Sequence, residues 1–117
     1  MSSLPESVRD KILSAQTVNG IPPGAPMVPY RNIGALLLER TEQYQVNPFL
    51  IFYSDEGYRK EYSYGEFYEE VCKTANFLRT KGIVGGDRLA TISYNHSDTV
   101  IQYFAAFLLG AVVVPIN

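Results

Sequence analysis

Cysteine, histidine and tryptophan are scarce in this sequence of 117 residues, which has one Cys, one His and no Trp. The lone Cys72 has no internal disulfide partner and fits a reducing compartment. A metal site needs several His, Cys or carboxylate ligands at suitable spacing, so we expect no metal centre. Cys72 is interpreted as a small, half-buried helix residue rather than a nucleophile, and no catalytic residue is predicted.

Strong charge and long apolar runs are also missing. Ten basic and twelve acidic residues give a net charge of −2, without a cluster of Lys and Arg that would attract nucleic acid. No run approaches the ~20 apolar residues of a membrane span, and the first residues do not read as a signal peptide. Neither a Walker-type nor a dinucleotide-type glycine loop is present. We therefore predict a cytoplasmic protein without nucleic-acid or membrane-spanning segments.

The composition is nonetheless that of a folded protein, because 46% of the residues are hydrophobic. Two segments are predicted. Residues 1–31 combine a short surface helix over 4–15 with an extended arm over 19–29, where two glycines and four prolines oppose regular structure. Residues 32–117 form the α/β part, with a chain length that suits one hydrophobic core.

The first half of this α/β part reads as a helix followed by a β-hairpin. Asn32 is the predicted N-cap, and the chain leaves the helix at Asn47 and Pro48. Two aromatic and branched strands follow over 49–53 and 58–62, around a turn with Gly57 at a position of positive φ. The inner face of the helix is predicted to hold Ile33, Leu36, Leu37, Arg40, Thr41 and Tyr44.

A second helix begins at Ser63, which forms a predicted capping box with Glu66. Phe67, Val71 and Ala75 recur at helical spacing and indicate its buried stripe, and Gly82 is expected just beyond its end. The tyrosines near this junction are interpreted as packing residues of the hairpin rather than a stacking platform. They are Tyr53, Tyr58, Tyr62, Tyr64 and Tyr68.

Residues 86–117 read as one β-α-β unit, with strands over 89–94 and 112–114 and an apolar helix over 98–109. Such strands should be parallel, and the continuous branched run before Pro115 is typical of a strand covered on both faces. The predicted fold class is α/β, with helices layered on a mixed, partly parallel sheet. A missing cover after the last strand favours a piece of something longer, and predicts self-association through the open sheet face or edge.

Asn95, His96 and Ser97 form the best candidate for a binding site, because ligands of open α/β sheets gather at the carboxyl ends of strands. The competing interpretation is a turn and an N-cap for the helix that follows. A triad of His96, Ser97 and Asp98 is disfavoured, since Ser97 and Asp98 suit the start of a helix better.

The segment Glu61-Tyr-Ser-Tyr-Gly-Glu-Phe67 resembles the Thr/Ser-Tyr-x-Glu-Leu opening of the adenylate-forming enzymes, which include acyl-CoA synthetases, adenylation domains and luciferases. The similarity extends over roughly residues 32–117. Its further landmarks, in family order, are Ala75-Asn-Phe-Leu78, Lys81-Gly-Ile83, Gly86-Asp-Arg-Leu-Ala90, Asn95, Ser97, Ala105-Ala106 and Leu109-Gly-Ala-Val-Val-Val-Pro-Ile-Asn117.

This resemblance implies the start of the large domain of an AMP-forming acyl-CoA synthetase. The parent activity implied is activation of a carboxylic acid with ATP and Mg²⁺ to an acyl-adenylate, followed by transfer to CoA. The residues that bind these groups lie in later family motifs, so none is assigned here and the chain alone is expected to be inactive. The residues Val112-Val-Val-Pro115 and Ile116-Asn117 depart from the peptide-synthetase pattern, and this departure leans toward acyl- or aryl-CoA synthetases. An adenylation domain that loads a carrier protein and a stand-alone α/β interaction domain remain alternatives.

Overall fold

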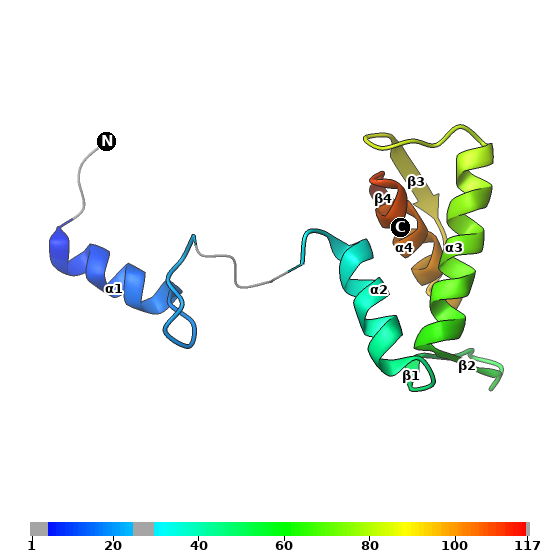
Figure 1. Ribbon diagram of the computed structural model, residues 1–117, viewed down its shortest axis with the longest axis horizontal. Coiled ribbons are helices and arrows are strands. Elements are labelled where there is room, and N and C mark those ends of the chain that lie inside the picture. The colour runs from blue at the N-terminus through cyan, green and yellow to red at the C-terminus, as the bar shows by residue number, and fades with distance from the viewer. Residues whose placement is uncertain (1–4, 25–29, 117) are drawn as a thin grey trace.

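A computed structural model describes residues 5–24 and 30–116 of the chain (Figure 1). The eight elements predicted from the sequence occur in the expected order, and each differs from the observed element only at its ends. The elements are α1 (Glu6–Gln16), α2 (Ile33–Tyr44), β1 (Pro48–Tyr53), β2 (Arg59–Ser63), α3 (Tyr64–Thr80), β3 (Arg88–Ile92), α4 (Ser97–Leu109) and β4 (Val112–Ile116).

The first helix stands apart from the rest of the chain. None of the residues of α1 is buried, and Figure 1 draws it well away from the other helices. Pro5 precedes it in an extended conformation, which suits a helix start because proline lacks an N–H to leave unpaired. Val18 and Ile21 form an antiparallel β-bridge across a tight turn, so the first part of the predicted arm is folded back on itself. Residues 25–29 of that arm lie outside the described residues.

Helix α2 begins as the sequence predicts, because the backbone N–H of Ala35 donates to Asn32 Oδ1 at 2.8 Å. Leu37 and Thr41 are buried on its inner face. The prediction that Ile33 belongs to this face is wrong, since its side chain is 43% exposed. Gly34 takes that place: a Cβ there would lie 2.8 Å from Leu108 Cδ2, so α2 and α4 approach closely at this residue.

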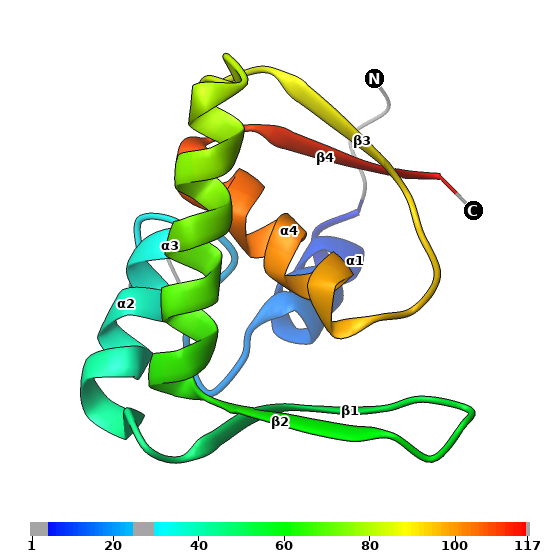
Figure 2. The ribbon, with the colours of Figure 1, turned by 90° about the vertical axis from the view of Figure 1, so that its right-hand side faces the viewer.

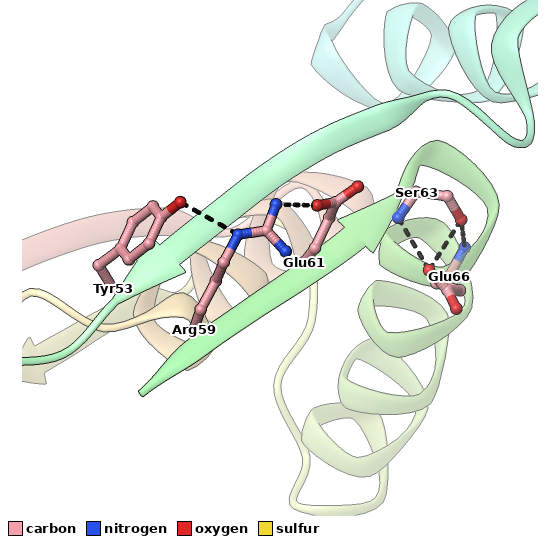
Figure 3. Close-up of polar contacts among 5 residues, drawn as sticks. All are labelled: Tyr53, Arg59, Glu61, Ser63 and Glu66. Carbon is pink, nitrogen blue, oxygen red and sulfur yellow. Dashed lines mark hydrogen bonds and ion pairs between the residues drawn. The ribbon is translucent and has the colours of Figure 1, made fainter. Parts of the chain in front are cut away.

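The hairpin and the capping box of α3 are confirmed. β1 and β2 pair antiparallel, and Gly57 has the positive φ of 83° that the turn requires. Ser63 Oγ accepts from the backbone N–H of Glu66 at 3.2 Å, while Glu66 Oε2 accepts from the backbone N–H of Ser63 at 2.8 Å (Figure 3). Two backbone donors at the helix start are thus satisfied by side chains.

The β-α-β unit has the predicted parallel pairing, with Ala90 opposite Val114 and Thr91 opposite Pro115. Pro115 therefore lies within β4 instead of ending it, which an edge strand tolerates because its outer N–H groups need no ladder partner. As the missing cover after the last strand predicts, one face of β4 is left open by the described residues. Its pairing with β3 leaves an outer face with exposed apolar side chains, formed by Ile92, Val112, Val114 and Ile116.

The two strand pairs form separate two-stranded sheets in the part of the chain that the structure describes, so the antiparallel hairpin and the parallel pair do not join into the one mixed sheet that the sequence predicts. Between them α3 and α4 pack along each other, and α2 packs against both (Figure 2). Phe67 is fully buried at the centre of this core, in contact with the rings of Phe49 and Phe104. The remaining buried members of the core are Leu37, Tyr62, Val71, Ala75, Ile101 and Ala105.

Candidate functional site

Asn95, His96 and Ser97 lie where the sequence places them, between the carboxyl end of β3 and the first turn of α4. Figure 2 shows the chain after β3 descending to the start of α4, with the β1–β2 hairpin below it. The loop and the hairpin therefore come from segments about forty residues apart in the sequence, and tertiary packing brings them together.

His96 is the N-cap of α4. Its backbone is extended, and its Nδ1 accepts from the backbone N–H of Asp98 at 3.1 Å. The ring also packs on Phe52 of β1, with centroids 4.6 Å apart and planes inclined by 58°. The capping interpretation of this residue is thus confirmed, and its ring joins the loop to the hairpin.

Ser97 is the most buried polar residue of the loop, with 1% of its surface exposed. Its Oγ has no hydrogen-bond partner among the described residues. Thr99 lies nearby, where its Oγ1 is 3.0 Å from Ser93 Oγ and 3.1 Å from the carbonyl oxygen of Tyr94. Burying a hydroxyl without a hydrogen bond costs free energy. Among the described residues, the Ser97 hydroxyl therefore does not stabilise the fold through a hydrogen bond.

An open cleft of about 660 Å³ separates the hairpin from the start of α4. All three predicted site residues line it, and Asp55 is the one charged side chain among the lining residues. Its volume lies within the ~300–1,000 Å³ of small-molecule sites. Besides Asp55 and the three loop residues, the walls include Phe52, Tyr94 and Tyr103. Sequence reasoning missed the hairpin side of this cleft, because no local pattern links β1 to a loop so far along the chain.

A polar network on the hairpin adjoins the cleft through Tyr53, which is one of the lining residues (Figure 3). Arg59 Nε donates to the hydroxyl of Tyr53 at 3.0 Å, and the same guanidinium forms an ion pair with Glu61. These contacts raise the pKa of Arg59, the bond to Glu61 contributing most. Tyr62 and Tyr64 instead pack inward or on Phe49, which supports the interpretation of these tyrosines as structural.

The described residues offer few groups for catalysis or for metal binding. No group of three or more His, Cys, Asp or Glu that could hold a metal ion occurs within residues 5–24 and 30–116. Cys72 is half-buried on α3 beside Tyr68, whose pKa is raised mainly by burial and then by the bond to Cys72. Each helix in the described ranges is too short or too polar to cross a bilayer.

Known proteins are similar to this chain over its α2, hairpin, α3 and β-α-β unit. Residues 37–117 match the family described as AMP-binding enzyme. The chain belongs to this family. A crotonobetaine/carnitine–CoA ligase of Salmonella paratyphi A is 34% identical over 87 residues, which are 74% of this chain and 17% of that protein. The resemblance to adenylate-forming enzymes is confirmed by these matches.

Solved structures agree on the fold. A fatty acyl CoA synthetase of Mycobacterium tuberculosis has a TM-score of 0.60 and 31% identity, over 74% of this chain and 16% of that one. The N-terminal subdomain of NpsA from Klebsiella oxytoca has a TM-score of 0.68 and 23% identity, over 75% of this chain and 22% of that one. The predicted α/β class, as the N-terminal part of an adenylate-forming domain, is confirmed. The chain spans only about a sixth of the length of the ligase and synthetase that it matches.

Proposed function

We propose that this chain is the N-terminal scaffold of an AMP-forming acyl-CoA ligase. The parent enzyme would activate a carboxylic acid with ATP to an acyl-adenylate and transfer the acyl group to CoA. The observation that carries this proposal is the family match over residues 37–117. A relative named as a CoA ligase supports it at 34% identity, and so does a structural neighbour named as a fatty acyl CoA synthetase. A role in fatty acid metabolism and a place in the cytoplasm are part of the proposal.

The lining of the cleft does not fit ATP, Mg²⁺ or CoA. Mg²⁺ is held by carboxylates and substrate phosphates, yet Asp55 is the one carboxylate that lines the cleft. Phosphates favour Arg, Lys or glycine-rich backbone, and no basic side chain lines the cleft. We assign these groups to the parts of the relatives that this chain does not match. The described residues act in capping and packing, which hold α3, α4 and the hairpin in one rigid scaffold.

The proposal is tested by assaying the protein encoded by the complete gene for carboxylate-dependent exchange between pyrophosphate and ATP. We expect exchange with that protein and none with the 117-residue chain, and CoA should convert the adenylate to a thioester. Absence of exchange over a panel of short, medium and long acids would count against the ligase. Exchange by the 117-residue chain would contradict only the expectation that this chain by itself is inactive.

An adenylation domain that loads a carrier protein is the second candidate, because NpsA and its carrier-protein fusion are among the structural neighbours. These likenesses lie at 23% identity and bear on the fold only. The same exchange assay separates the two candidates when it is followed by acceptor competition. Thioester on CoA supports the first, and thioester on a phosphopantetheinylated carrier supports the second. A stand-alone interaction domain is favoured if neither forms.

We also propose that the isolated chain self-associates through the outer face of β3 and β4. Exposed apolar side chains in a row are prone to pair with a second copy. Ile92 is 82% exposed on this face, so Ile92→Lys should disrupt association without disturbing the core. Val46 is 84% exposed on the turn before β1, and Val46→Lys is the matched control. Sedimentation should show a concentration-dependent mass that Ile92→Lys alone abolishes; a constant monomer mass contradicts the proposal.

A further inference from the structure

We propose that α1 of one copy of this chain docks on the outer face of β3 and β4 of a second copy, which returns the same contact. This inference rests on the self-association proposed above, and it names the surface that each copy offers to the other. It starts from two apolar surfaces that the described residues leave open, one on a helix and one on a pair of strands.

Helix α1 has an apolar stripe that no other described residue covers. Val8, Ile12 and Ala15 recur at positions i, i+4 and i+7, which places them on one side of the helix. The acidic residues Glu6 and Asp10 lie on the opposite side. None of the residues of α1 is buried. Since a short amphipathic helix is stabilised mostly by packing its apolar side, α1 lacks within one copy the contact that its pattern predicts.

The outer face of β3 and β4 is the side of the strand pair that points away from α4. Thr91 Oγ1 donates to the hydroxyl of Tyr103 on α4 at 3.5 Å, so Thr91 faces this helix. The neighbouring residues Ala90 and Ile92 then point to the other side, because side chains alternate along a strand, and both are exposed. Parallel strands are normally covered by helices on both faces. The pair therefore has one helix, α4, and lacks the second.

The size of α1 suits this face. α1 has 11 residues and is about 16 Å long, and β3 and β4 have 5 residues each and are also about 16 Å long. A helix is about 10 Å across, which is wide enough to cover two strands about 5 Å apart. One helix with the length of α1 is thus sufficient to cover the open face.

A second copy is the partner that covers all of these surfaces. Residues 17–32 join α1 to α2 and can extend over ~55 Å, and Figure 1 shows α1 well away from the other helices. In a two-fold exchange each copy gives one helix and receives one, so two contacts form for a single loss of translational and rotational freedom. Packing the two strand faces on each other would instead leave both α1 stripes in water.

The test begins with single variants of the full chain. Ile12→Lys places a charge in the α1 stripe, and Ile92→Lys places one on the strand face. Each should raise the Kd of self-association, measured by sedimentation, by more than about tenfold, because a buried isoleucine is lost from the contact. Ser14→Lys adds the same charge nearly opposite Ile12 on α1 and should leave the Kd unchanged. All three side chains are exposed, so circular dichroism should show an unchanged fold.

A mixture of the two Ile→Lys variants then distinguishes helix exchange from other modes of association. Ile12→Lys keeps an intact strand face and Ile92→Lys keeps an intact α1, so one helix–face contact can form between them although neither associates with itself. With one variant ¹⁵N-labelled, native mass spectrometry should detect this mixed pair.

Three results would overturn the helix exchange. Association that survives Ile12→Lys and is abolished by Ile92→Lys would leave the proposed self-association standing, with strand faces packed on each other. A mixture that forms no pair would exclude docking of α1 on the second copy. A wild-type chain that stays monomeric at all concentrations would contradict the self-association as well, whereas the ligase proposal is tested separately by pyrophosphate exchange.

Discussion

Phe67 offers the sharpest test of how this scaffold is held together. Its side chain is fully buried, and its ring centroid lies 4.5 Å from that of Phe49 and 5.3 Å from that of Phe104. It therefore joins β1, α3 and α4 at one point. Replacing a buried Phe with Ala costs ~3–5 kcal/mol, from lost transfer free energy and from the cavity left behind. The two ring contacts favour the upper half of that range.

The control lies on the same helix. Phe77 is 58% exposed, and its ring meets the Lys81 ammonium at 5.3 Å from the centroid. Phe77→Ala should cost no more than about 1 kcal/mol, because an exposed cation–π contact is worth roughly that much. Two substitutions of the same type, ten positions apart on one helix, are thus expected to differ several-fold in their effect on the free energy of unfolding.

Urea unfolding followed by circular dichroism measures this difference. With a typical slope of ~2 kcal/mol per molar, a loss of about 4 kcal/mol lowers the midpoint by ~2 M. A domain of this size has ~5–15 kcal/mol in total, so Phe67→Ala is expected to be severely weakened. Phe67→Leu, with a loss of about 1–2 kcal/mol, keeps the comparison measurable if the Ala variant does not fold. Equal costs at Phe67 and Phe77 would refute the assignment of the core.

The remaining predictions concern the caps and the buried hydroxyl. Ser63→Ala removes the N-cap acceptor of α3 and should cost ~1 kcal/mol, against almost nothing for Ser7→Ala on the exposed α1; equal effects in urea would contradict the capping role. The backbone and hydroxyl bonds from Ser63 lower the pKa of Glu66 below 4.5, so its stabilising contribution is present above that pH and lost as the pH falls through the folded-state pKa. Glu66→Gln should flatten this acid limb of the stability profile, and an unchanged limb would contradict the bond. Ser97→Ala should leave stability unchanged or raised, because the hydroxyl is buried without a partner among the described residues; a loss above about 1 kcal/mol would reveal a partner for the hydroxyl.

The candidate site could be predicted only in part. A strand followed by Asn95, His96 and Ser97 indicated a loop at a sheet edge, and the same residues also predicted a helix cap. Both statements hold, because His96 caps α4 and lines the cleft at once. Phe52 and Asp55 could not be foreseen as the opposite wall, since their contact with the loop depends on how the hairpin docks on α3 and α4.

Local chemistry alone determined most of the secondary structure. The capping box at Ser63, the N-cap at Asn32 and the positive φ of Gly57 each follow from hydrogen bonds or backbone freedom within a few residues. The family resemblance was likewise readable from ordered short motifs. Burial and proximity were decided only by the tertiary structure. Ile33 faces water because Gly34 brings α2 close to α4, and the hairpin stays separate from the β3–β4 pair because α3 and α4 pack between them. Such outcomes depend on contacts between distant segments, which no local pattern records.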